Sequence, residues 1–288
     1  MNESRSGGCV SSEAWLPTLA AVGGISLISL IGAIAGLRWF RRHTVILTLV
    51  ALAAGSLLGD ALLHLLPEAS ELWGGLTPEV GGLVLLGFGL FFILESALRS
   101  GHAHGELLQQ DHDHPGHGHE HGHAHTPAKK APSMEPTRAR IATFGWMNLV
   151  GDGLHNFLDG IVIAAAFVVD PLVGLATTVA VALHEIPQEL GDFAVLLRAG
   201  MRPAQAILFN LLSALLAVAG ASLFLVAPFD PAVLERFALP IAAGGFLYIA
   251  AADLIPELHH HTGDRHVLNI LLGFAAGLAA MACLLFLE

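Results

Sequence analysis

Residues 148–167 read NLVGDGLHNFLDGIVIAAAF, and residues 181–197 read VALHEIPQELGDFAVLL. Both stretches place ionisable and amide side chains inside apolar runs that are long enough to form helices. The two predicted helices, 141–169 and 172–197, meet at Asp170-Pro171, a dipeptide that favours a turn. We therefore expect an antiparallel helix pair with polar faces.

The composition is typical of a membrane protein. Of the 288 residues, 54% are hydrophobic and 13% are charged, whereas soluble domains carry about 25% charged residues. The net charge of −11 argues against nucleic acid as a partner. The two cysteines, Cys9 and Cys283, stand near opposite ends of the chain and predict neither a disulfide framework nor a thiolate metal site.

Eight apolar blocks predict eight transmembrane helices and an all-α integral membrane protein, because lipid offers no hydrogen-bond partner to an open backbone. The predicted spans are 15–37, 45–66, 80–98, 141–169, 172–197, 204–226, 236–256 and 267–287. They divide the chain into an N-terminal tail with spans 1–3 (1–98), a long loop (99–140), spans 4 and 5 (141–197) and spans 6–8 (198–288).

The basic residues predict the orientation. With eight spans, eleven of the thirteen Lys and Arg residues fall on one side, and only Arg5 and Arg236 fall on the other. The positive-inside rule places the eleven in the cytoplasm and both termini outside it. A chain rich in Ala, Leu and Gly, without targeting signals, suits a bacterial inner (plasma) membrane.

The loop between spans 3 and 4 is rich in histidine and poor in apolar residues, so we expect it to be disordered and cytoplasmic. Alternating histidines bind transition metals, which predicts a metal buffer or sensor. A linker with incidental metal affinity is the alternative. The nine histidines are His102, His104, His112, His114, His117, His119, His121, His123 and His125.

The polar residues of spans 4 and 5 have helical spacing. In span 4 they lie at i, i+3, i+4 and i+7, on one face of the helix. The histidines of the two spans each lie about fourteen residues from the turn, roughly 20 Å along a helix, and should reach the same depth. The residues are Asp152, His155, Asn156 and Asp159 in span 4, and His184, Glu185, Gln188, Glu189 and Asp192 in span 5.

Ionisable groups inside a bilayer are costly and usually functional. Imidazole nitrogens together with carboxylate and carboxamide oxygens suit zinc, and also ferrous iron, manganese or cobalt. The alternative is that these groups only satisfy one another. So many polar positions on two adjacent spans favour an intramembrane metal site.

Weaker signals lie in other spans. Asp60 and His64 are either an entrance or exit relay or a helix-end pair, and Asp253 and Glu257 predict an accessory metal or proton path. Asn210 either reaches the central site or makes a helix-packing hydrogen bond. Glu95, near the end of span 3, is expected to snorkel to the interface. Glycines at 81–82, 244–245, 273 and 277 predict closely packed helices.

HNFLDG (155–160) and HEIPQELGD (184–192) closely resemble the signature of ZIP (Zrt-, Irt-like protein) metal transporters, in the branch whose span 5 reads HExPHExGD. GDALLHLLPEA (59–69) and FLYIAAADLIPEL (246–258) resemble the same branch. The resemblance implies that spans 1–3 and 6–8 are inverted repeats around spans 4 and 5. It also implies alternating-access transport of Zn²⁺, or of Fe²⁺, Mn²⁺ or Cd²⁺, toward the cytoplasm, without an organic cofactor, and a homodimer.

The family pattern implies a set of ligands. The transport-site ligands would be His155, Asn156, Asp159, His184, Glu185 and Gln188, with Asn210 as a neighbour. The accessory or pathway residues expected from their positions in the spans are Asp152, Glu189, Asp192, Asn210, Asp60, His64, Asp253 and Glu257. Some family members hold two metals, bridged by a carboxylate at the position of Gln188. Because a neutral carboxamide binds metal more weakly, Gln188 predicts an altered second position and an altered metal preference.

Three alternatives remain. The first is an exporter of the cation-diffusion-facilitator type, and the eight predicted spans count against it. The second is an intramembrane metalloprotease, whose HExxH motif needs a histidine where Gln188 stands, so no enzyme is expected. The third is a passive metal-binding membrane protein in which the histidine-rich loop is the functional element.

Overall fold

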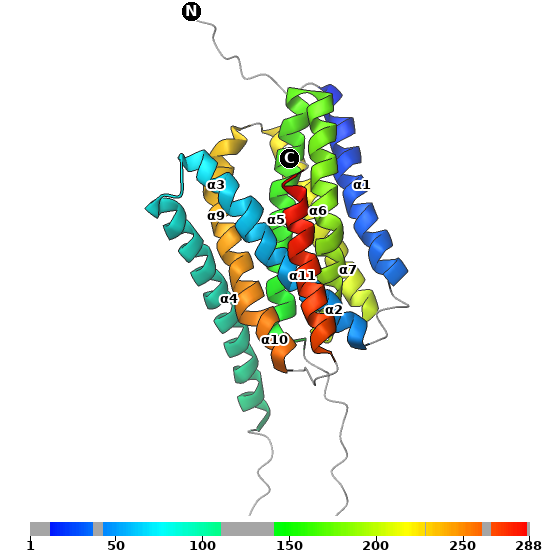
Figure 1. The fold of residues 1–288 in the computed structure, drawn as a ribbon, viewed down its shortest axis with the longest axis vertical. Coiled ribbons are helices and arrows are strands. Elements are labelled where there is room, and N and C mark those ends of the chain that lie inside the picture. The colour runs from blue at the N-terminus through cyan, green and yellow to red at the C-terminus, as the bar shows by residue number, and fades with distance from the viewer. Residues whose placement is uncertain (1–11, 37–42, 111–140, 228, 261–265, 287–288) are drawn as a thin grey trace, which may run out of the picture.

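The computed structural model describes residues 12–36, 43–110, 141–227, 229–260 and 266–286, and every element among them is helical. The helices form eight rods that run up and down the long axis of the molecule (Figure 1). The rods are α1 (Ser12–Gly36); α2 (His43–Asp60) continued by η1 (Ala61–Leu65) and α3 (Leu66–Trp73); α4 (Pro78–Gln110); α5 (Thr143–Val169); α6 (Pro171–Arg198); α7 (Pro203–Ala214) continued by α8 (Leu216–Val226); α9 (Pro231–Tyr248) continued by η2 (Ile249–Leu254) and α10 (Ile255–His260); and α11 (Val267–Leu284).

Six of these rods are long and apolar enough to cross a membrane, within the part of the chain that the structure describes. The first exception is α1, whose apolar part, Ala14–Leu27, is shorter. The second is α6, where the predicted site residues lower the hydropathy of the helix. The predicted all-α membrane fold is confirmed. Each predicted span coincides with a rod. That all eight rods cross the membrane stays a prediction.

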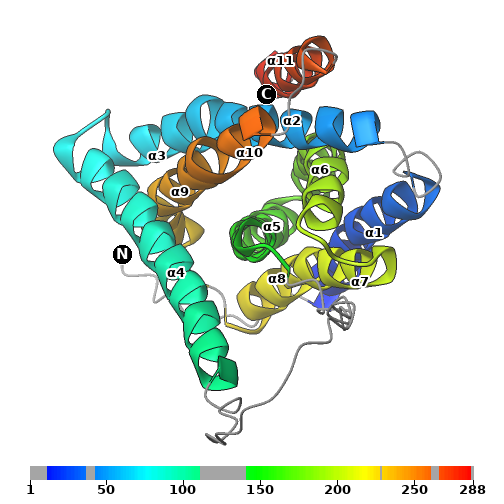
Figure 2. The same cartoon turned by 90° about the horizontal axis from the view of Figure 1, so that it is seen from below.

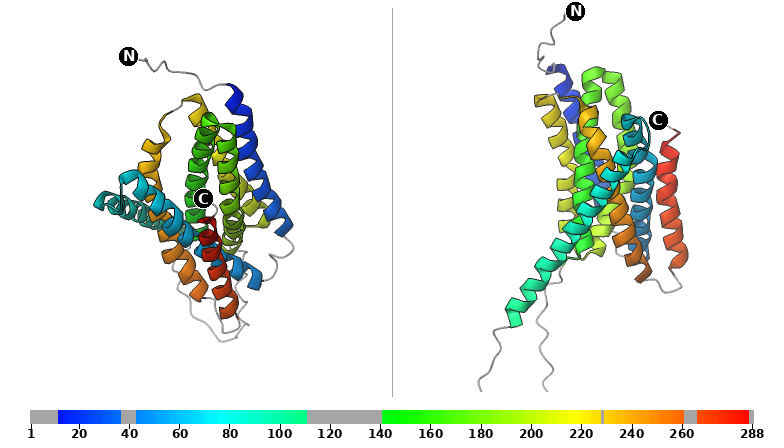
Figure 3. Two further views of the ribbon diagram at one scale, coloured as in Figure 1. Left: turned by 45° about the horizontal axis from the view of Figure 1, so that its top comes forward. Right: turned by 90° about the vertical axis from the view of Figure 1, so that its left-hand side faces the viewer.

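Span 3 is longer than predicted, because the first residues of the loop expected at 99–140 are helical. Helix α4 continues past Arg99 to Gln110, because residues 101–110 contain Ala, Glu, Leu and Gln, which favour helix. Figure 3 shows α4 crossing the other rods at a slant and projecting beyond them at this end. His102 and His104 lie on this extension, whereas the loop histidines from His112 to His125 lie outside the described residues.

Helices α5 and α6 form the predicted hairpin and lie in the middle of the bundle (Figure 2). The turn between them is defined by Asp170, whose carboxylate accepts hydrogen bonds from the N–H groups of Leu172 at 2.7 Å and Val173 at 3.4 Å. Pro171 follows as the first residue of α6, where its missing N–H costs nothing. Helices α1 and α2 pack on α6, and α8 packs on α5, so the hairpin is enclosed by other helices.

Glycine allows several helix pairs to meet backbone to backbone. A Cβ on Gly244 of α9 would collide with the carbonyl of Val84 on α4, and one on Gly273 of α11 would collide with the carbonyl of Thr48 on α2. The predicted close approach at Gly244–245, Gly273 and Gly277 is therefore confirmed. It is wrong for Gly81 and Gly82, because a Cβ at either position would meet no atom within 4 Å.

Two rods contain a wide helical turn just before a proline. The π-helical turn η1 precedes Pro67, and η2 precedes Pro256. A proline ring leaves no room for a regular hydrogen bond to the preceding turn, so the helix widens there. Such turns often occur at functional positions, and these two carry His64 and Asp253.

Glu95 does not snorkel as predicted. Its side chain is 6% exposed, accepts a hydrogen bond from the hydroxyl of Tyr248 on α9, and pairs with Arg99 one turn later on α4. The sequence could not show that α9 presents a hydrogen-bond donor at this depth, which draws the carboxylate inward.

We expect Gly244→Ala to destabilise the protein by about 1–3 kcal/mol, because the added methyl group would force α4 and α9 apart. Gly81→Ala is the matched control, since the same change in open space should leave stability unchanged or slightly raised. Thermal unfolding in detergent, followed by size-exclusion chromatography, measures both. Equal unfolding temperatures for the two variants would show that close α4–α9 contact is not required.

Candidate metal centre

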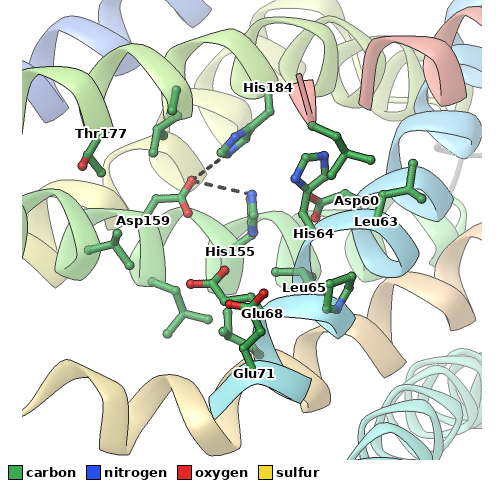
Figure 4. Close-up of a pocket in the computed structure, with 17 residues that line it drawn as sticks. Asp60, Leu63, His64, Leu65, Glu68, Glu71, His155, Asp159, Thr177 and His184 are labelled. Carbon is green, nitrogen blue, oxygen red and sulfur yellow. Dashed lines mark hydrogen bonds and ion pairs between the residues drawn. The ribbon is translucent and has the colours of Figure 1, made fainter. Parts of the chain in front are cut away.

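Four side chains converge at mid-height of the α5–α6 hairpin. His184 Nε2 lies 3.2 Å from Asp159 Oδ2, and His155 Nε2 lies 3.6 Å from the same oxygen (Figure 4). Glu185 Oε1 is 3.7 Å from His155 Nε2 and 3.9 Å from His184 Nε2. The two imidazole ring centres are 5.3 Å apart, which confirms that the histidines of the two helices reach the same depth.

This arrangement matches the coordination sphere of a divalent metal. One possible ligand atom from each of the four residues lies within 4.8 Å of the other three. Ligands of a tetrahedral zinc ion stand about 2.0–2.2 Å from the metal, which puts them roughly 3.4 Å from one another. The site needs only small side-chain movements to reach that geometry. Two imidazoles and two carboxylates also suit other divalent transition metals.

The burial of the polar side chains at this site favours a bound cation. Glu185 is 1% exposed, and neither of its carboxylate oxygens has a hydrogen-bond partner among the described residues. His155 Nε2 also lacks one among them, and the ring of Phe246 packs against this imidazole at 5.4 Å. A buried carboxylate without a compensating charge is strongly unfavourable, so a bound metal ion would stabilise the arrangement.

A cavity of about 450 Å³ leads to the site. His155, Asp159 and His184 form its inner end, while Glu185 lies behind them. Its other residues on the hairpin, such as Val162 and Thr177, lie beside the site or between it and the α5–α6 turn. The cavity therefore extends from the metal site toward the end of the molecule where that turn lies.

The cavity wall contributed by α2, η1 and α3 is acidic. Asp60, His64, Glu68 and Glu71 all line it (Figure 4). Asp60 is 2% exposed, and His64 Nε2 lies 3.0 Å from the carbonyl oxygen of Met281 on α11. Asp60 and His64 thus line the cavity, and a relay formed by them stays a prediction. Glu68 and Glu71 were missed, because in sequence they look like solvated charges beyond the end of a span.

The other predicted polar residues of the hairpin are buried behind the metal site and do not line the cavity. The Asn156 amide donates to Asp152 Oδ1 at 2.9 Å and to the Asp152 carbonyl at 3.2 Å, which leaves the Asn156 carbonyl oxygen available as a ligand. The Asn148 amide donates to Asp192 Oδ1 at 2.9 Å. Asn148 was missed, although it stands four residues before Asp152 on the same helical face.

Asn210 of α7 joins this buried group by donating a hydrogen bond to Glu189, so it contacts a polar neighbour of the site and not the four converging residues. Gln188 is 3% exposed, and neither atom of its amide has a hydrogen-bond partner among the described residues. An unsatisfied buried polar group costs about 1–3 kcal/mol. Gln188 is therefore the least satisfied residue of the predicted second metal position.

Asp253 and Glu257 lie outside the cavity lining. Asp253 is 7% exposed within η2, and Glu257 forms a 2.8 Å ion pair with Arg198 at the end of α6. This ion pair links the helix that carries His184 to α10. The structure thus separates these two acidic residues from the cavity that holds His155, Asp159 and His184.

Comparison with known proteins gives a consistent result. Residues 12–285 match the sequence profile of the family described as ZIP zinc transporter. The chain is 34% identical over 285 residues to the rat zinc transporter ZIP4, a match that covers 85% of this chain and 43% of the relative. It is 33% identical over 255 residues to the mouse zinc transporter ZIP13, covering 83% of this chain and 70% of the relative. A shorter match, 47% identical over 128 residues, covers 44% of this chain and 15% of zebrafish zinc transporter ZIP10.

The chain thus spans less than half the length of rat ZIP4 and more than two thirds of mouse ZIP13. These relatives are animal proteins, so they give no support to the bacterial membrane expected from the sequence.

We expect Glu185→Gln to abolish most of the thermal stabilisation by zinc without lowering the stability of the metal-free protein. The amide keeps the shape of the side chain but removes a buried charge that costs energy in the absence of metal. Zinc raises the unfolding temperature only to the extent that it binds the folded protein. Unfolding temperatures with and without zinc measure both effects, with His112→Ala as the control. A full zinc-induced shift in Glu185→Gln would contradict this assignment.

Proposed function

The chain belongs to the ZIP zinc transporter family, and we propose that it carries zinc across a membrane through the cavity between α2–α3 and the α5–α6 hairpin. The convergence of His155, Asp159, His184 and Glu185 at the inner end of that cavity carries this proposal. In this function the metal ion is the cargo. The acidic wall attracts the cation, and the four residues replace its water ligands.

We propose that transport proceeds by alternating access. The cavity reaches the metal site from the end with the α5–α6 turn, while the buried group of Asp152, Asn156, Gln188, Glu189 and Asp192 fills the other side. Release of the ion on that side requires the hairpin to move relative to its neighbours. The Arg198–Glu257 ion pair joins α6 to α10 and would have to break or shift in such a movement.

An inverted repeat would explain why two pairs of helices pack in the same way. If spans 1–3 and 6–8 are related, α2 corresponds to α9 and α4 corresponds to α11. The close pairs α2–α11 and α4–α9 then become equivalent. The wide turns η1 and η2, each just before a proline, occupy corresponding positions in α2–α3 and α9–α10. This correspondence supports a repeat arrangement around the central hairpin.

We propose that transport runs toward the cytoplasm, with both termini on the opposite side. The eleven-to-two distribution of basic residues supports this orientation. It places the cavity mouth outside the cytoplasm and the nine loop histidines inside it. Zinc released on that side would meet the loop, which is suited to act as a metal buffer.

We expect His184→Ala to lower zinc uptake into proteoliposomes at least about tenfold, the effect of losing roughly 1.4 kcal/mol of binding. The reason is that His184 supplies one of the two nitrogen ligands. The control is His119→Ala, which removes one of nine loop histidines and should leave uptake intact. Normal uptake by correctly folded His184→Ala would refute the proposed transport site.

We also propose that Gln188 broadens the metal preference beyond zinc toward the harder ions manganese and ferrous iron. Its amide offers a weak oxygen ligand where an imidazole would favour zinc. Gln188→His should therefore raise the preference for zinc over manganese by roughly tenfold, or about 1.4 kcal/mol. Competition between the two metals during uptake measures this ratio. An unchanged ratio would show that residue 188 does not determine metal choice.

A further inference from the structure

Two histidines that play no part in the cavity face each other at the opposite end of the fold. His43 is the first residue of α2, and His266 immediately precedes α11. Their ring centres are 5.9 Å apart, with the ring planes at 62°. We propose that His43 and His266 form a second transition-metal site, separate from the transport site and independent of transport.

The ring separation is suitable for sharing one ion. Two imidazoles whose nitrogens each lie about 2 Å from a zinc ion have ring centres roughly 5–6 Å apart. The two histidines of the transport site, which take part in the four-residue cluster, have ring centres 5.3 Å apart. The His43–His266 pair therefore needs little adjustment to hold a metal between its rings.

Thr44 supplies the interaction that orients one ligand. Its hydroxyl oxygen lies 3.4 Å from His266 Nδ1. Metal-binding histidines usually use one ring nitrogen for the metal and the other for a hydrogen bond that fixes the ring. If Thr44 holds Nδ1, Nε2 of His266 would be the ligand atom. A ring contact between His43 and His266 would not by itself require the interaction between Thr44 and His266.

The helices that carry the pair are fixed against each other. Helices α2 and α11 run parallel, and backbone contacts at Gly273 with Thr48 and at Gly277 with Leu52 set their register. These contacts begin within about two turns of the histidines. A metal ion would therefore bind a pair whose backbone is already in place, which lowers the entropic cost of binding.

The position also separates this pair from the transport cavity. His43 precedes His64, a residue of the cavity wall, by twenty-one positions along one continuous rod, which corresponds to roughly 30 Å. Figure 1 shows the starts of α2 and α11 at the end of the molecule where α4 terminates. In the proposed orientation this end is cytoplasmic, so the pair would meet metal on the side of the histidine-rich loop.

The chemistry favours ions that accept imidazole and complete their coordination with water. Zn²⁺, Cu²⁺ and Ni²⁺ meet this condition, whereas Mg²⁺ prefers oxygen ligands. Both histidines stand at helix N-termini, whose partial positive charge opposes a cation. We therefore expect weaker binding here than at the four-residue transport site.

Site-resolved histidine modification tests the proposal in the full chain, where the loop histidines would obscure a bulk binding measurement. The purified protein is treated with diethylpyrocarbonate, and the rate at each histidine is measured by peptide mass spectrometry, with Zn²⁺ or Mg²⁺ present. Zinc at about ten times its dissociation constant should slow the reaction at His43 and His266 about tenfold, because only unliganded rings react. Mg²⁺, which prefers oxygen ligands, should have no effect and serves as the control.

Two variants separate metal binding from ring contact. His266→Ala should remove zinc protection at His43, and His266→Phe should do the same, although it keeps an aromatic ring in contact. Protection of His43 that persists in either variant would overturn the proposal. So would equal modification rates of wild-type His43 with and without zinc.

Discussion

The carboxylate of Glu185 is buried at a depth where neither lipid nor protein groups solvate it, and the rest of the structure depends on this burial. The side chain is 1% exposed, and its near neighbours include Asp159 and the imidazoles of His155 and His184. Such a charge is tolerated inside a protein only when an opposite charge, a proton or a metal ion compensates it. Because two imidazole rings stand beside the carboxylates, a divalent cation would satisfy all four residues at once.

The surrounding helices enclose this arrangement. Close contacts such as Gly244 with Val84 and Gly273 with Thr48 bring neighbouring rods together backbone to backbone. Helices α1, α2 and α8 cover the hairpin itself. The cavity that reaches the candidate site is bounded on one side by α2, η1 and α3, which contribute the acidic side chains of Asp60, Glu68 and Glu71. In the proposed function, the ion enters along this wall.

Much of this could be read from the sequence, because helical periodicity and the turn at Asp170 determine the depth of each hairpin residue. His155 and His184 were placed correctly for that reason. Contacts between distant segments could not be read in this way. The inward turn of Glu95 depends on Tyr248 of another helix, and the role of Glu68 depends on how α3 leans over the cavity. The sequence also could not show that Gly81 faces open space, because small residues alone do not reveal which helices pack against each other.

The neutral amides behind the metal site complete the physical account of transport. A carrier must bind its ion tightly enough to replace the ion's water ligands, yet must also release it. Carboxylates at every position would hold a divalent cation too firmly, and without the ion they would repel one another. Asn156, directed by Asp152, and Gln188 instead offer carbonyl oxygens without charge. An ion moving past the four-residue cluster would therefore meet the uncharged oxygens of Asn156 and Gln188 among the carboxylates of Asp152, Glu189 and Asp192, and the two amides would keep this group from holding the ion as firmly as five carboxylates would.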